Sequence, residues 1–97
     1  MSLYLDSQAL LCLQQMLHQH LPQTSVWAFG SRVKNSAHAN SDLDLVAFLP
    51  STQTDRLASL KEAFDDSPIP CRIDIHIWDN LPENFQRNIR ACYVPIQ

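Results

Sequence analysis

The sequence predicts a small α/β (α+β) fold, in which helices pack mainly against one face of a β-sheet. The hydrophobic pattern along the 97 residues switches repeatedly between the period of a helix and the period of a strand. The chain contains one glycine, whereas average usage would give about seven, so glycine-dependent hairpins are scarce. We therefore expect a single domain over residues 1–97, with a three-stranded sheet, and not a many-stranded all-β fold.

The pattern divides the chain into elements in a definite order. We expect helix 7–20, strand 26–29, a short helix beginning near residue 32, strand 42–49, helix 54–65, strand 71–78, helix 82–91 and a short extended piece at 93–96. The apolar face of the first helix consists of Leu10, Leu13, Leu17 and Leu21. Asp6 or Ser7 can cap its start, and Pro22 ends it.

The next two strands enclose a polar segment. Residues 26–29 are all apolar, which predicts a short buried strand. Residues 42–49 begin with alternating acidic and apolar side chains and end before Pro50. Since successive side chains of a strand point to opposite faces, Asp42 and Asp44 must share one face of this strand.

The rest of the chain repeats the alternation of helix and strand. Thr54 can cap the helix over 54–65, whose large apolar residues fall on one face. Strict alternation in 71–78 places three isoleucines on one face and Asp74 on the other. Pro82 suits the first position of the last helix, because proline has no N–H group that a helix interior would need.

Composition excludes several classes of function. Seven basic and ten acidic residues give a formal net charge of −3, so there is no broad cationic surface for autonomous nucleic-acid binding. One glycine is too few for a dinucleotide fingerprint or a P-loop. Three widely spaced cysteines without a C-x-x-C pair fit reduced thiols. With neither a signal peptide nor a membrane span predicted, we expect a cytoplasmic protein without membrane association.

The residues that indicate chemistry are Gly30 and Ser31 at the end of one strand and the D-x-D pair Asp42 and Asp44 at the start of the next. Two carboxylates on one face repel each other without a cation, and magnesium commonly binds one or two carboxylates together with substrate phosphates. Glycine lets a ligand approach the main chain, and the serine hydroxyl can bond a phosphate. Asp74 adds a third carboxylate if the two aspartate-bearing strands are neighbours. This arrangement predicts metal-assisted phosphoryl or nucleotidyl transfer.

These residues resemble the nucleotidyltransferase superfamily related to DNA polymerase beta, over about residues 7 to 94. The short chain and the ending Leu81-Pro82-Glu83-Asn84-Phe85 followed by Ile89 resemble its minimal branch, the MNT or MntA-like antitoxins. The resemblance implies a mixed sheet with helices and the transfer of AMP from ATP to a hydroxyl. It also implies a partner, a HEPN-type toxin that is neutralised by adenylylation of a tyrosine.

The same resemblance implies a role for each motif residue. The triphosphate of ATP would be held by Gly30, Ser31 and Arg32. Two magnesium ions would be bound by Asp42 and Asp44. Asp74 would complete one of the metal sites and act as, or position, the base that deprotonates the acceptor hydroxyl.

Simpler interpretations remain open for several residues. Asp42 and Asp44 can mark an exposed edge strand, and Asp74 can pair with Arg72 or His76. His76 shares the face of Asp74 and is a possible contact to metal or substrate. Core packing is the expected use of the aromatic residues Trp27, Phe29 and Trp78. A second function also remains open: a non-catalytic antitoxin or binding module that neutralises its partner by complex formation, with oligomerisation possible.

Overall fold

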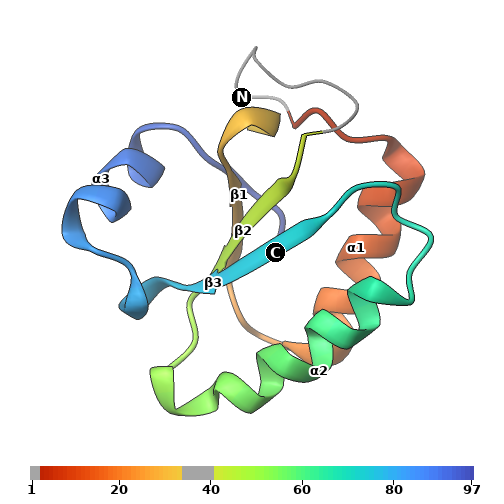
Figure 1. Cartoon of the computed structure of the whole chain (residues 1–97), viewed down its shortest axis with the longest axis horizontal. Coiled ribbons are helices and arrows are strands. Elements are labelled where there is room, and N and C mark those ends of the chain that lie inside the picture. Colours follow the sequence, from red (N-terminus) through yellow and green to blue (C-terminus); the bar gives the residue numbers. More distant parts are fainter. Residues whose placement is uncertain (1–2, 34–40) are drawn as a thin grey trace.

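The chain forms three α-helices and one four-stranded sheet within residues 3–33 and 41–97, the part that this computed structural model describes (Figure 1). The helices are α1 (Ser7–His20), α2 (Thr54–Asp65) and α3 (Glu83–Ala91). The strands are β1 (Val26–Phe29), β2 (Leu43–Ala47), β3 (Ile73–Ile77) and β4 (Val94–Pro95). Single 3-10 turns lie at Ser31–Val33, Ser51–Gln53 and Trp78–Asn80. The predicted helices and strands are confirmed, with ends that agree to within two residues.

The sheet is mixed and its strands lie in the order β3-β2-β1-β4. β2 and β3 are parallel and are connected through α2, whereas β1 is antiparallel to both β2 and β4. The prediction of three strands was wrong, because the sheet also contains the short strand β4. The extended piece expected at 93–96 pairs with β1, and the N–H of Val26 donates to the carbonyl of Gln97 at 3.0 Å.

The prediction that helices pack mainly against one face of the sheet is confirmed, since two of the three described helices share a face. α1 and α2 pack on one face against Leu43 and Leu45 of β2, both fully buried. Figure 1 shows α3 on the opposite side of the sheet, where Ile89 packs against Phe29 and Val46. The preference for one face therefore holds for two of the three helices. α3 takes the other face because β1 and β2 are apolar on both sides along part of their length.

An aromatic cluster extends the packing beside α3. Its members are Trp27, Phe48, Trp78 and Tyr93. The rings of Trp27 and Tyr93 stack with centroids 3.9 Å apart, and Phe48 approaches Trp27 edge-on at 4.6 Å. The expectation that Trp27 and Trp78 serve in core packing is therefore confirmed.

The helix ends test the capping predictions. The carboxylate of Asp6 accepts hydrogen bonds from the N–H groups of Gln8 and Ala9 at 3.2 and 3.3 Å, which confirms Asp6 as the cap of α1. Thr54 does not cap α2, because the preceding 3-10 turn places Gln53 at that position. Pro82 lies at the cap position of α3, one residue earlier than expected. No helix within the described residues is both long and apolar enough to cross a membrane.

Candidate functional site

Gly30 and Asp44 meet where β1 ends beside β2. Phe29 pairs with Asp44 in the antiparallel ladder, so the next residue, Gly30, lies beside the aspartate side chain. Gly30 has φ +82°, and a Cβ atom on it would lie 2.6 Å from Oδ2 of Asp44. Only glycine combines this left-handed conformation with a carboxylate so close to its Cα. The single glycine of the chain is thus required here for two separate reasons.

Asp44 and Asp74 are paired residues of the neighbouring parallel strands β2 and β3. The predicted adjacency of the two aspartate-bearing strands is confirmed, and both side chains lie on the face that α3 partly covers. Burial raises the pKa of Asp44, the charges of Asp74 and Asp42 raise this pKa further, and His76 lowers it. The ionised form of Asp44 is therefore disfavoured first by burial and then by the two neighbouring carboxylates.

The three carboxylates do not converge on one point in the present side-chain arrangement. Among the residues at 3–33 and 41–97, no group of three His, Cys, Asp or Glu side chains is placed to hold a metal ion. Oδ1 of Asp74 lies 3.4 Å from Nε of Arg72, so the simpler pairing expected for Asp74 is observed. Asp42 is exposed and precedes β2 by one residue. The strand ladder thus places Asp44 beside Asp74, with Asp42 one residue before β2.

His76 belongs to the same surface. It is exposed, lies two residues after Asp74 on β3, and its ring centroid is 6.3 Å from that of Phe29. Because His76 also lowers the pKa of Asp44, its imidazole lies close to the carboxylates of Asp44 and Asp74.

A pocket of about 260 Å³ opens beside Gly30 and Asp44. Its other lining residues are Phe29, Phe85, Asn88, Ile89 and Cys92. Most of these residues belong to or directly follow α3, and we did not identify Phe85, Asn88 or Cys92 as site residues from the sequence. Their spacing of three and four residues places them on one helix face, and this spacing is the feature of the sequence that could have identified them. That signal predicts that the residues share a face but not which strand the face contacts.

Ser31 and Arg32 follow Gly30 in the 3-10 turn, with different surroundings. Ser31 is half-buried and begins the turn. The guanidinium of Arg32 is 5% exposed and donates to the carbonyls of Ser41 at 2.9 Å and Tyr4 at 2.7 Å. Arg32 does not line the Gly30–Asp44 pocket. Nucleotide binding by Arg32 stays a prediction, and the structure gives this side chain a role in joining three separate segments.

We expect Arg32→Lys to lower the free energy of unfolding by about 1–3 kcal/mol, because an ammonium cannot reproduce the two directed hydrogen bonds of the guanidinium. Urea unfolding measures this change, and Arg87→Lys is the matched control because Arg87 is 74% exposed. A variant with unchanged stability but weakened ATP binding would contradict the structural role and support the nucleotide contact.

Comparisons with known proteins identify a family and a fold for this chain. Residues 12–96 match the profile of the family described as "Polymerase beta, Nucleotidyltransferase". A Haemophilus influenzae protein named "Probable protein adenylyltransferase MntA" is 44% identical over 95 residues, which cover 96% of this chain and 82% of that protein.

Two crystal structures show the same fold. One, of a toxin–antitoxin with AMP-PNP, aligns with a TM-score of 0.63 at 15% identity over 95% of this chain and 73% of the other. The second, of the toxin–antitoxin MntA–HepT, aligns with a TM-score of 0.60 at 13% identity over 95% of this chain and 72% of the other. The family match, the related sequence and the shared fold lead to one conclusion: this chain belongs to the polymerase beta nucleotidyltransferase family.

Proposed function

We propose that this nucleotidyltransferase is a magnesium-dependent protein adenylyltransferase, which transfers AMP from ATP to a tyrosine hydroxyl of a HEPN-type toxin and so acts as its antitoxin in the cytoplasm. The observation that carries the proposal is the meeting of Gly30, Asp44 and Asp74 on adjacent strands. Support comes from the relative named as a protein adenylyltransferase, and from the toxin–antitoxin structures that share the fold, one with AMP-PNP and one named MntA–HepT.

The residues on this face suit magnesium. Asp42, Asp44 and Asp74 offer only carboxylate oxygens, the ligand type that magnesium prefers. Burial, followed by the charges of Asp74 and Asp42, raises the pKa of Asp44, and a divalent cation would offset both effects. When bound, two magnesium ions would stabilise negative charge on the attacking and leaving oxygens of the transfer.

The chain's own residues would bind and orient the reactants. The main chain at Gly30 and the hydroxyl of Ser31 would hold the triphosphate beside Asp44, with the nucleotide extending over the 260 Å³ pocket. The acceptor oxygen forms a bond to the α-phosphorus, and the bond from the α-phosphorus to the oxygen that bridges to the β-phosphorus breaks. Pyrophosphate leaves, and the carboxylate of Asp74 takes the hydroxyl proton.

Label transfer tests this function. We expect AMP from α-labelled ATP to become attached to the proposed HEPN-type toxin when magnesium is present, and not when EDTA removes it. Asp42→Asn should lower the rate at least about 100-fold, because one ligand of the proposed metal site is lost. Asp66→Asn is the matched control, since Asp66 is an exposed carboxylate at the C-terminus of α2.

Two outcomes would contradict the proposal. Transfer that survives both Asp42→Asn and Asp44→Asn would remove the assigned site. Neutralisation of the toxin without any attached label would instead establish the non-catalytic antitoxin, which acts by complex formation alone.

A further inference from the structure

Among residues 3–33 and 41–97, β3 has a strand partner on only one side of its backbone. In the order β3-β2-β1-β4 it is an edge strand that pairs only with β2, and in Figure 1 it lies in front of the other strands. The N–H of Leu43 donates to the carbonyl of Arg72 at 2.8 Å, which fixes the pattern of the parallel ladder. Consequently Asp74 and His76 direct their peptide groups toward β2, whereas the N–H and C=O groups of Ile73 and Ile75 point away from the sheet.

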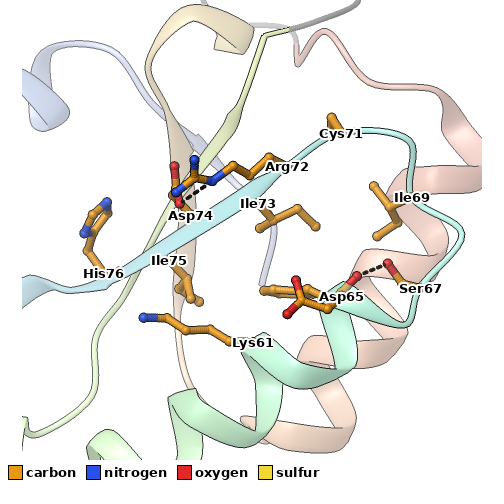
Figure 2. A pocket seen from close by; sticks show the side chains of 11 residues that line it. Lys61, Asp65, Ser67, Ile69, Cys71, Arg72, Ile73, Asp74, Ile75 and His76 are labelled. Atoms are coloured by element: carbon orange, nitrogen blue, oxygen red, sulfur yellow. Dashed lines mark hydrogen bonds and ion pairs between the residues drawn. The ribbon is translucent and has the colours of Figure 1, made fainter.

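A groove runs along this free edge between β3 and α2. It consists of two adjoining hollows, of about 540 and 350 Å³, which share Lys61, Ile75 and His76. The α2 wall extends from Thr54 at one end, through Ala58 and Lys61, to Asp65 at the other. Figure 2 shows Ile73 and Ile75 on the side of β3 that faces α2, and Asp74 and His76 on the opposite side. We refer to the two hollows together as the β3–α2 groove.

We propose that the β3–α2 groove binds an extended segment of the acceptor protein as an additional strand on β3, so that its hydroxyl-bearing side chain reaches Asp74. This inference rests on the proposed function and adds the way in which the acceptor is recognised. Among the described strands, the outward N–H and C=O groups of Ile73 and Ile75 have no ladder partner, and another extended main chain could bond them. This edge of the sheet is therefore suited to bind an additional β-strand. Ile73 is partly exposed, whereas Ile75 is only 3% exposed, so an added strand would contact Ile73 first.

The period of a strand explains how the hydroxyl reaches the carboxylate. In an added strand, alternate side chains point to opposite faces of the sheet. Two of them, separated by one residue, would enter the two hollows on the α2 side. The residue between them then points to the face that carries Asp74 and His76.

The strand order separates the two substrates in a way that suits transfer. Asp44 on β2 lies between Asp74 on β3 and Gly30 at the end of β1. A nucleotide at Gly30 and an acceptor at the edge of β3 would approach Asp44 from opposite sides. Each substrate would have its own binding surface, with the reacting groups meeting over the middle strand.

Charge in the groove favours recognition through the main chain. Lys61 and Arg72 are basic, Asp65 and Asp74 are acidic, and all four line the larger hollow. A surface with both signs does not select a strongly charged partner. We infer that the acceptor segment is chosen for its extended conformation and for two side chains that fit the hollows.

Amide hydrogen exchange, followed by NMR on the labelled full chain with the unlabelled HEPN-type toxin, tests the added strand. We expect the amides of Ile73 and Ile75 to exchange at least about tenfold more slowly in the complex. Those of Asp74 and His76, which already bond to β2, should be slow in both states. Unchanged exchange at Ile73 and Ile75 in the complex would overturn the proposal. Protection of the same two amides in the free protein at high concentration would also overturn it, because a second copy would then occupy the edge.

A pair of substitutions on α2 tests the groove by steady-state kinetics. Ala58→Trp should fill the smaller hollow and raise KM for the toxin at least about tenfold, with little change in the affinity for ATP. Ser59→Trp adds the same bulk at a neighbouring exposed position outside the groove and should change neither value. An unaltered KM in Ala58→Trp would overturn the proposal.

The two proposals fail in different ways. If AMP is transferred but the amides of Ile73 and Ile75 are not protected, the adenylyltransferase activity is supported and the added strand is ruled out. Protection without AMP transfer leaves the groove as a toxin-binding surface and removes the proposed enzymatic activity.

Discussion

Asp44→Asn is expected to reduce AMP transfer roughly 1,000-fold, the largest loss that we predict for a single side chain. Asp44 is the carboxylate that touches both halves of the proposed site, with Gly30 against its Oδ2 atom and Asp74 as its ladder partner. Asparagine keeps the shape but loses the negative charge that a metal ion requires. Label transfer to the toxin measures the loss, with Asp66→Asn as the control.

The same substitution should make the fold more stable at neutral pH. Burial and the neighbouring Asp74 and Asp42 raise the pKa of Asp44, so the folded protein binds this proton more tightly than the unfolded chain does. The resulting stabilisation is complete below the unfolded-state pKa and is lost as the pH rises through the folded-state pKa. Asparagine cannot ionise, so the variant avoids this loss.

The expected gain is at most about 1 kcal/mol, because the side chain is only half-buried and solvent screens its charge. Urea unfolding of wild type and Asp44→Asn from acid to neutral pH measures it. The stability difference should grow with pH in favour of the variant. A difference that shrinks as the pH rises would show that Asp44 is stabilised by its surroundings when it is ionised, and would remove the electrostatic argument for a cation.

Gly30→Val is expected to abolish detectable ATP binding while costing the fold about 1–3 kcal/mol. A side chain here must adopt φ +82° and must also displace the carboxylate of Asp44, because its Cβ would lie 2.6 Å from Oδ2. Such a displacement moves the carboxylate of Asp44 out of the proposed metal site, and the new side chain covers the main chain that the phosphates would approach. Calorimetry with a non-hydrolysable ATP analogue measures binding, and urea unfolding measures stability.

Gln23→Val separates backbone strain from damage to the site. Gln23 has φ 62°, the same left-handed region, but it is exposed in the turn after α1 and far along the chain from Asp44. We expect a loss of stability there with unchanged ATP binding. If Gly30→Val binds the analogue as well as wild type does, Gly30 is only a turn residue and the site assignment is wrong.

Much of the fold is encoded in local pattern. The 3.6-residue spacing of α1 and the strict alternation of β3 each identify an element by its own period, so both are predictable without knowledge of their neighbours. β4 is different, because a strand of two residues has no period to detect and exists only through its pairing with β1. The cap predicted for α2 was also wrong, because the 3-10 turn before the helix makes Gln53 the cap residue and Thr54 the first residue of the helix.

The sequence by itself determined the residues of the motif: one glycine before a serine, the pair Asp42 and Asp44, and Asp74 on a later strand. Of the pair, only Asp44 lies within β2. Only the tertiary structure decided that Asp44 lies against Gly30, that Asp74 is its direct neighbour and that α3 supplies the wall of the pocket. The physical reason is that side-chain alternation is a property of each strand alone. Register and layer order depend instead on burying apolar surface from segments that are distant in the chain.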